Sequence, residues 1–291
     1  MKGGGTPSSL LEGLPRSDSA TKVGRTGQVA IVTFAAIWLL MFVGMILASE
    51  GRSSADVATV GAIALVSVPI LIVVNLVANT RYLIRSDRLL AEAEAHLARD
   101  PARALSAASD ALKLGTSAVD KRLRAWMVVA EIAEARGAFG DADEALERGL
   151  VRRRGRVVRW DRGLVVHALL RRAFVAAAHG ALDAAERCLA DCQPDELTNP
   201  LYAAEEARAR ILIAYRRGRF REVVDLVTDA FGRAVVADER HRQLLEALRQ
   251  SSMLRLDAET GVHPMRVADP IAEDDPWLEA IVHEPRRRLV R

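Results

Sequence analysis

Two long stretches without a single charged residue constrain this chain more than any other feature. Residues 26–49 and 57–80 contain no Asp, Glu, Lys or Arg, although 27% of the 291 residues are charged. A helix of about twenty apolar residues is long enough to cross the roughly 30 Å hydrocarbon core of a bilayer. We therefore expect a transmembrane hairpin over residues 26–80, with spans at about 28–48 and 57–79.

Two other interpretations of the apolar stretches stay open. In one interpretation the first stretch is a cleaved signal peptide, because Leu47-Ala48-Ser49 resembles a small-residue cleavage site. The apolar region of a signal peptide is usually only about 7–15 residues long, which is shorter than this stretch. In the other interpretation, both stretches form a buried helical hairpin, but nothing downstream is apolar enough to cover them on all sides.

Basic residues near the ends of the two stretches predict an orientation. They are Lys2, Arg16, Lys22 and Arg25 before the first stretch, Arg52 in the connection, and Arg81, Arg85 and Arg88 after the second. Loops rich in Lys and Arg stay in the cytoplasm. We therefore expect a multi-pass protein of the inner (plasma) membrane with both termini in the cytoplasm, and the lipid bilayer as one of its partners.

The region from residue 81 to residue 255 has the composition of a helical domain and contains signals for the starts and ends of helices. It is rich in the good helix formers Ala, Leu, Arg and Glu. Asp100-Pro101 and Asn199-Pro200 each offer an N-cap followed by proline at the first helical position. The predicted helices lie near 85–98, 101–114, 118–136, 139–153, 162–179, 181–192, 200–217, 219–231 and 236–253.

Three stretches of this region align on a glycine between two predicted helices. The glycines are Gly137, Gly180 and Gly218, at spacings of 43 and 38 residues. Each has alanine four residues before it, a small or β-branched residue five after it, and an aliphatic residue nine after it. A more divergent fourth copy covers residues 95–108. Self-similarity of this kind predicts stacked pairs of antiparallel helices.

The aligned stretches resemble tetratricopeptide repeats (TPRs). Trp126 stands eleven residues before Gly137, and the copies together cover about 95–233, although their spacing exceeds the 34 residues of the standard repeat. The resemblance implies an all-α protein in which a TPR-like α-solenoid follows the two membrane helices, with a concave face that holds a peptide or protein segment. The residues that match its packing positions are Trp126, Ala130, Gly137, Ala142, Gly180, Ala185 and Gly218.

The layout of two amino-terminal spans followed by helical repeats is also similar to the HemY-like inner-membrane proteins of bacteria, a family linked to haem biosynthesis. The similarity is one of layout, and no functional residue is carried over. It implies an accessory protein of a membrane-associated biosynthetic pathway.

No combination of residues in the sequence predicts catalysis. The six histidines show no paired metal-binding spacing, and the glycine-rich phosphate-binding and nucleophile motifs are missing from the sequence. Cys188 and Cys192 lie four residues apart without the further ligands that a zinc site needs. We therefore expect no enzyme, no cofactor and no metal, and two thiols packed at a helix interface.

Residues 151–162 hold the most concentrated charge, six arginines against one aspartate. The candidate partner-binding residues are Arg152, Arg153, Arg154, Arg156, Arg159 and Trp160. Together they suit an acidic protein segment, anionic lipid headgroups, or RNA with Trp160 stacking on a base. A solvated helix end, where arginines favour the negative end of the helix dipole, is the simpler alternative. The net charge of only +3 makes nucleic acid the least favoured partner.

Both ends of the chain are predicted to be mostly disordered: the leader 1–25, and the tail 256–291, which is first acidic and then basic. Within the tail, residues 275–281 also fit one short amphipathic turn that docks on a groove, either of the chain itself or of another protein. Disorder is the alternative for these residues.

These observations together predict a membrane-tethered scaffold or adaptor, whose TPR-like domain recruits a protein partner to the inner membrane. An acidic segment of that partner is one candidate for the part that is bound. The HemY-like accessory role is the alternative function. A nucleic-acid tether through the arginine cluster is a third.

Overall fold

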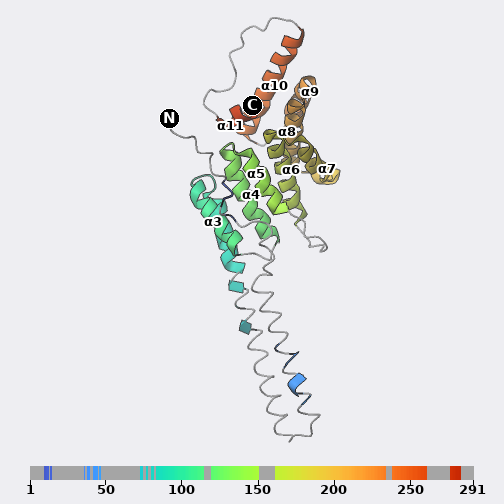
Figure 1. Ribbon diagram of the computed structural model, residues 1–291. Helices are drawn as coiled ribbons and strands as arrows, with labels where there is room; N and C mark the ends of the chain where they lie inside the picture. The colour runs from blue at the N-terminus through green and yellow to red at the C-terminus, as the bar shows by residue number, and fades with distance from the viewer. Residues whose placement is uncertain are drawn as a thin grey trace, which may run out of the picture. The chain divides into compact units, whose positions relative to one another are not determined.

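The computed structural model describes residues 10–12, 14, 83–114, 119–150, 161–233, 238–260 and 276–282, with scattered positions between 36 and 81. The chain divides into two compact units: an amino-terminal unit of residues 14–122, and a helical unit that combines residues 1–13 and 123–291. Within the described residues every regular element is a helix (Figure 1), which confirms the predicted all-α class.

The structure contains nine α-helices and one 3₁₀ helix from residue 101 onward among the described residues. They are α3 (Pro101–Lys113), α4 (Val119–Ala135), α5 (Phe139–Leu150), α6 (Arg162–His179), α7 (Leu182–Ala190), the 3₁₀ helix η2 (Pro194–Thr198), α8 (Pro200–Arg216), α9 (Phe220–Gly232), α10 (Glu239–Thr260) and α11 (Pro276–Val282). The bounds of α3 to α9 agree with the predicted helices to within three residues. Helix α10 continues past the predicted domain end at 255, and part of the predicted tail forms α11.

Helix starts are set by side chains that accept from free backbone N–H groups. The side chain of Asp161 accepts from Gly163 and Leu164 at the start of α6. The side chain of Asn199 accepts from the Leu201 N–H at 3.0 Å, next to the proline that begins α8. These bonds satisfy donors that the first turn of a helix leaves without an intrahelical acceptor.

The carboxyl-terminal ends of α4, α6 and α8 share one turn geometry. Gly137, Gly180 and Gly218 have φ angles of 72°, 97° and 72°, in the left-handed region where side chains with a Cβ are strained. At the first of these turns the N–H of Ala138 donates to the carbonyl of Ala133, and corresponding bonds close the other two. The repeated glycines therefore reverse the chain after each of these helices.

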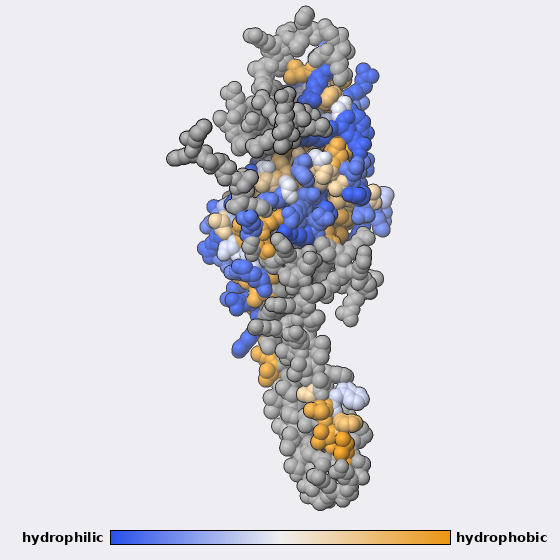
Figure 2. All heavy atoms as spheres, viewed as in Figure 1, coloured by the Kyte–Doolittle hydropathy of each residue, from blue (hydrophilic) through white to orange (hydrophobic). Residues whose placement is uncertain are grey.

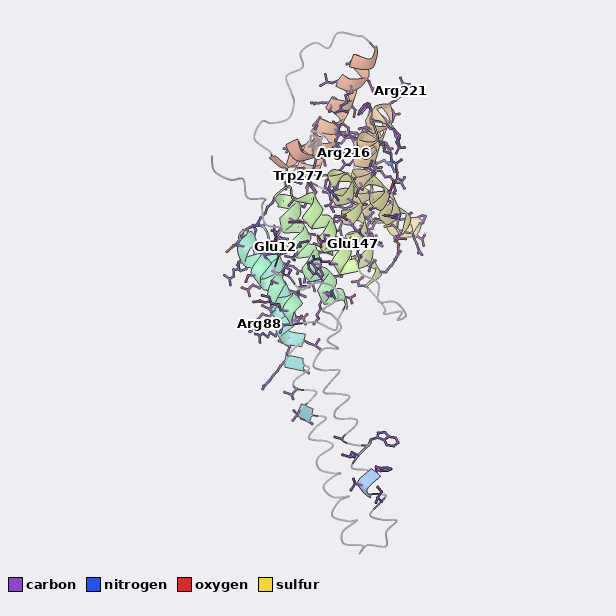
Figure 3. The ribbon with its side chains drawn as sticks, in the orientation of Figure 1. Glu12, Arg88, Glu147, Arg216, Arg221 and Trp277 are labelled. Carbon is purple, nitrogen blue, oxygen red and sulfur yellow. The ribbon has the colours of Figure 1, made fainter. Side chains whose placement is uncertain are left out.

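Helix α6 is the centre of the helical unit. It contacts α5, α7, α8 and α11. Its buried side chains include Leu170, Phe174 and a run of alanines, Ala176 to Ala178. The small alanine side chains let neighbouring helices approach closely, and the larger ones fill the space between them. Arg216 of α8, labelled in Figure 3, donates to the carbonyl of Ala178 at 2.9 Å and ties the ends of α6 and α8 together.

Helices α4 and α5 approach each other closely at a glycine. A Cβ added to Gly149 in α5 would lie 2.9 Å from Leu123 Cδ1 and 3.0 Å from Trp126 Cβ. Trp126 is fully buried at this crossing. The absence of a side chain at position 149 is therefore what lets the indole of α4 pack against the backbone of α5.

The amino-terminal unit is described mainly from residue 83 onward, where residues 83–96 are helical. Arg103 of α3 forms an ion pair with Glu92 at 2.7 Å, and Lys121 pairs with Asp87 at 2.6 Å. The scattered described positions of the two apolar stretches are helical, and several of their large side chains are exposed, among them Leu39 and Val74. Figure 2 shows hydrophobic side chains at the surface in orange.

The structure contradicts the predicted localisation. Among the helices in the described part of the chain, none is both long enough and apolar enough to cross a membrane. Even α6, with 18 residues, carries Arg162, Arg171 and Arg172, and charges within a span are costly. Most of the predicted spans, 28–48 and 57–79, lies outside the described residues. The prediction of a multi-pass inner-membrane protein with both termini in the cytoplasm is therefore contradicted by the described helices.

Residues near both chain ends lie on the helical unit. In the predicted leader, the Leu10 N–H donates to the Asp141 carboxylate of α5 at 2.9 Å, and Leu11 is buried. In the predicted tail, residues 276–282 form α11, which packs on α6 and α10. The structure therefore places seven residues of the predicted tail in a helix on this unit.

We expect Gly149→Ala to lower the free energy of unfolding by about 1–2 kcal/mol. Overpacking at the α4–α5 crossing costs about 1–3 kcal/mol, and the higher helix propensity of alanine offsets about 0.5–1 kcal/mol of that. The matched control is Gly140→Ala in the same helix, where an added Cβ meets nothing within 4 Å. Urea unfolding of both variants measures the difference; equal stabilities would contradict the close approach at Gly149.

Candidate functional site

A cluster of charged side chains from three helices lies buried in the helical unit. Arg171 of α6 contacts Glu134 of α4 at 2.6 Å, and Arg208 of α8 approaches the same carboxylate at 3.7 Å. The three side chains are only 9–13% exposed. Buried charges of this kind are tolerated when they are paired and hydrogen-bonded. The cluster therefore ties α4, α6 and α8 to one another at a defined register.

The pKa values of the cluster follow from its composition. Burial by itself would raise the pKa of Glu134, but the charges of Arg171 and Arg208 outweigh it and hold the pKa of that carboxyl below its usual value. Burial opposes the charge on Arg171, and the Glu134 and Glu131 carboxylates nevertheless raise the pKa of its guanidinium. Glu134 and Arg171 therefore both stay ionised at neutral pH.

Two further carboxylates belong to the cluster. Glu131 contacts Arg171 at 2.8 Å, and Glu205 contacts Arg208 at 2.6 Å within α8. The guanidinium of Arg208 also lies 3.8 Å from the ring centre of Phe174. Arginine over an aromatic face is attracted by the negative potential of the ring. Phe174 is thus the point where the charge cluster meets the aromatic side chains.

Aromatic rings extend from Phe174 to the carboxyl-terminal helix. The ring of Phe139 in α5 meets Phe174 edge-on with centroids 6.5 Å apart, and the ring of Trp277 in α11 lies 6.3 Å from Phe174 on a tilted plane. Arg240 of α10 covers Trp277 at 4.2 Å. Figure 3 labels Trp277 where α11 meets the rest of the helical unit. Side chains of α6 and α10 therefore contact one end of α11, and side chains of α5 and α8 contact Phe174 in turn.

The other end of α11 is held by Tyr215 of α8. The Tyr215 hydroxyl donates to the Val282 carbonyl at 3.1 Å and also contacts the Ser251 hydroxyl at 2.8 Å. The last carbonyls of a helix have no intrahelical donor, so the tyrosine satisfies one of them. We define the α11 seat as Phe174, Tyr215 and Arg240, which contact α11, together with Arg208, which lies over Phe174.

Helix α11 buries one face on its seat. Trp277, Leu278, Ile281 and Val282 are each at most 5% exposed. Burying four such side chains contributes roughly 6–12 kcal/mol, at roughly 1.5–3 kcal/mol each. Ordering the seven residues of the helix costs about 10 kcal/mol, at about 1.5 kcal/mol per residue. The docking of α11 is therefore close to balance, and modest changes in the contacts decide whether the helix is docked.

A buried histidine adjoins the charge cluster. His241 of α10 is 3% exposed, and its backbone N–H donates to Asp238 at 2.7 Å. Burial, reinforced by the positive charge of Arg208 and only partly offset by Asp238, lowers the pKa of its imidazole to about 4. His167 of α6 has a lowered pKa for the same two kinds of reason, burial first and then the charge of Arg171. Both imidazoles are neutral at pH 7.

The predicted repeat-packing residues lie at the helix contacts and turns. Trp126, Ala130, Ala142 and Ala185 are buried in α4, α5 and α7, and the three glycines occupy the turns described above. The predicted partner-binding residues Arg152, Arg153, Arg154, Arg156, Arg159 and Trp160 all lie outside the described residues. The described structure therefore places the first set and leaves the arginine cluster a prediction.

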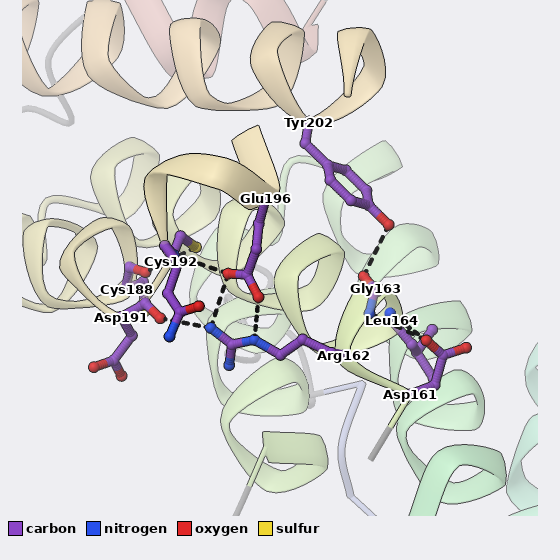
Figure 4. Close-up of polar contacts among 10 residues, drawn as sticks. Asp161, Arg162, Gly163, Leu164, Cys188, Asp191, Cys192, Glu196 and Tyr202 are labelled. Atoms are coloured by element: carbon purple, nitrogen blue, oxygen red, sulfur yellow. Dashed lines mark hydrogen bonds and ion pairs between the residues drawn. The ribbon is translucent and has the colours of Figure 1, made fainter. Parts of the chain in front are cut away.

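The segment 151–160 joins two helices that border a cleft of about 580 Å³. The cleft lies between α5, α6 and α7, and its lining includes Glu147, Arg172, Arg187 and Cys188. At its edge Arg162 forms an ion pair with Glu196 and donates to the Asp191 carbonyl at 3.1 Å (Figure 4). In the same view the Tyr202 hydroxyl donates to the Gly163 carbonyl at 3.0 Å.

The two cysteines are free thiols in the described part of the chain. Cys188 and Cys192 are buried, and the thiol of Cys192 donates to the Cys188 carbonyl at 3.4 Å. Burial raises the pKa of both thiols to about 11, which keeps them protonated and poorly reactive at neutral pH. The described residues also contain no group of three or more His, Cys, Asp and Glu side chains that is arranged to hold a metal ion.

The residues of the charge cluster and of the α11 seat are absent from the sequence-based predictions. Arg171 did carry a signal, because Arg171 and Arg172 interrupt a predicted helix that is apolar from Leu164 to Ala178 apart from these arginines and His167. A charge on the buried side of a helix is expected to have a partner. The sequence alone does not show that Glu134 and Arg208, 37 residues away on either side, provide the contacts.

Comparisons with known proteins identify no relative. No protein-family model matches the chain, no curated protein matches it, and no solved structure matches it. The resemblance to tetratricopeptide repeats and the similarity in layout to HemY-like proteins therefore stay predictions from the sequence.

We expect Glu134→Gln to lower the free energy of unfolding by about 2–4 kcal/mol, because it leaves Arg171 and Arg208 buried without their shared counter-charge. Glu186→Gln is the matched control: Glu186 pairs with Arg217 at 2.7 Å, but both side chains are more than a third exposed, and such pairs contribute at most about 1 kcal/mol. Urea unfolding at pH 7 compares the two. Similar losses would show that the cluster does not behave as a buried network.

The unfolding free energy is expected to fall as the pH is lowered from 7 to 5. The folded state keeps His241 neutral with a pKa of about 4, whereas the unfolded state protonates it near its ordinary pKa of 6.5. Stability is therefore complete above pH 6.5 and is lost progressively below it, by about 2 kcal/mol at pH 5 from this group. Replacing His241 with Gln should flatten the pH dependence of urea unfolding. Parallel curves for the two proteins would contradict this assignment.

Proposed function

We propose that the helical unit is a protein-binding scaffold, a TPR-like α-solenoid that holds a short segment of a partner protein. The observation that carries this proposal is α11 on its seat. A seven-residue helix, separated from α10 by residues 261–275, is held through side chains of α6, α8 and α10. Surfaces that hold one short helix in this way are suited to peptide recognition.

The turn geometry supports the helical-repeat part of the proposal. The helices α4, α6 and α8 each end at a glycine of positive φ and are each followed at once by a shorter helix. Pairs made in this way bury one face against the next pair, and the stack leaves other faces for binding. Helix α10 contacts both α8 and α9 and so covers the last pair.

The composition of the α11 seat supports a protein as the ligand. It combines two aromatic residues with two arginines, and these residue types are enriched where proteins bind proteins. Its arginines Arg208 and Arg240 lie against aromatic rings, and a planar guanidinium can hold both a ring and a carboxylate. An acidic or aromatic segment of a partner fits these contacts.

Site-specific photocrosslinking in cells tests the proposal. A benzoylphenylalanine at position 240, beside Trp277, is expected to yield a discrete adduct with another protein. The same group at position 186 on the exposed side of α7 serves as the matched control and should not yield that adduct. Adducts that are identical at both positions, or only crosslinks within the chain itself, would overturn the proposed function.

A further inference from the structure

We propose that α11 is an internal ligand that occupies the partner's binding site, and that the partner's segment is a short amphipathic helix of the same kind. The inference rests on the proposed function and adds the chemistry of the segment. The segment begins with acidic residues, continues with an aromatic residue at position i, and carries aliphatic residues at i+1, i+4 and i+5. The juxtaposition that supports it is Trp277 on Phe174 at one end of α11 and Val282 on Tyr215 at the other.

The spacing of the buried side chains defines the pattern. Trp277, Leu278, Ile281 and Val282 are spaced so that they lie along one side of a helix, and all four are buried. The aromatic position is the most specific of the four, because its ring is enclosed by Phe174 and by the guanidinium of Arg240 at 4.2 Å. A smaller side chain at this position would leave both of these contacts unfilled.

The two ends of the seat fix the length of the ligand. Arg240 and Phe174 hold the side chain one residue after the start of α11, and the hydroxyl of Tyr215 binds the carbonyl of its last residue. This arrangement selects a helix of about two turns that ends near the tyrosine. The last carbonyl of an external helix also has no intrahelical donor, so it can accept the same hydrogen bond from the Tyr215 hydroxyl.

Charge favours an acidic segment. Glu273, Asp274 and Asp275 directly precede α11 in the sequence, and acidic residues before a helix are favourable because of its dipole. Arg240 lies over Trp277, and Arg255 lies over the ring of Tyr215 at 5.4 Å, whereas Arg208 is already paired with Glu134 and Glu205. A partner segment with the same acidic start is therefore complementary to this surface.

Tethering explains why α11 occupies the seat in the absence of a partner. Only the 15 residues 261–275 separate it from the end of α10, and a short tether gives an effective concentration in the millimolar range. A partner segment must compete with that concentration. Because α11 is too short to be a stable helix by itself, a partner segment of the same length and pattern that is already helical in its own protein can displace it.

Fluorescence anisotropy with a labelled peptide of residues 270–285 tests the inference on the full chain. Trp277→Glu combined with Ile281→Glu should undock α11, and this opened chain is expected to bind the peptide at least tenfold more tightly than the unaltered chain does. A peptide with Trp277→Ala should bind neither protein. Adding Arg240→Gln to the opened chain should weaken binding of the original peptide about threefold to tenfold, because it removes the cation over the indole.

A second variant guards against a failure to fold. Glu279→Pro prevents the α11 helix without altering the side chains of its buried face or of the seat, and it should open the seat to the peptide as well. Circular dichroism checks that both opened chains keep the helical content of α3 to α10. Equal peptide affinity for the opened and the unaltered chain would overturn the inference.

Two further outcomes separate this inference from the proposed function. If the opened chain ignores the peptide while the photocrosslinked adduct at position 240 persists, the function stands and the inference falls. If the peptide binds but no adduct with another protein forms, the proposed function falls. Light scattering completes the test, because a dimer of the unaltered chain that dissociates when α11 is undocked would mean that a second copy is the occupant, which contradicts an external partner.

Discussion

The structure of the helical unit depends on the enclosure of α6. This helix is apolar around most of its circumference and contacts α5, α7, α8 and α11, yet it carries Arg171 in its buried part. An unpaired guanidinium there would be prohibitively costly, so the surrounding helices must bring carboxylates to it. Glu134 from α4 meets this requirement directly. The need to cover an apolar helix and to neutralise its one deeply buried charge therefore fixes which helices surround it.

The same requirement extends to the carboxyl-terminal helix. Arg208 reaches Glu134 on one side and lies over Phe174 on the other, and Phe174 in turn contacts Trp277. The charge cluster and the α11 seat are thus consecutive parts of one set of contacts. The Trp277 side chain therefore packs on a surface whose geometry is already set by the buried ion pairs. This preorganisation reduces the entropy that binding a short helix would otherwise cost.

Local signals in the sequence predicted the helices and failed on the contacts between distant segments. Caps such as Asn199 and turn glycines such as Gly180 act through bonds within a few residues, so the helix bounds could be predicted closely. The prediction for the apolar stretches rested on length and hydropathy alone, and its localisation is not upheld by the described helices. The tail left two alternatives, because a helix as short as α11 has no stability of its own and its state depends on what it packs against.

The sequence by itself determined the helical class, the helix ends and the repeated turns of this protein, because each depends on propensities and hydrogen bonds that act over a few residues. Only the tertiary structure decided that Glu134, Arg171 and Arg208 share one buried cluster, and that Trp277 is enclosed by Phe174 and Arg240. These contacts join residues 37 to more than 100 positions apart. Their partners are chosen by the packing of whole helices, which places every side chain of a face at once.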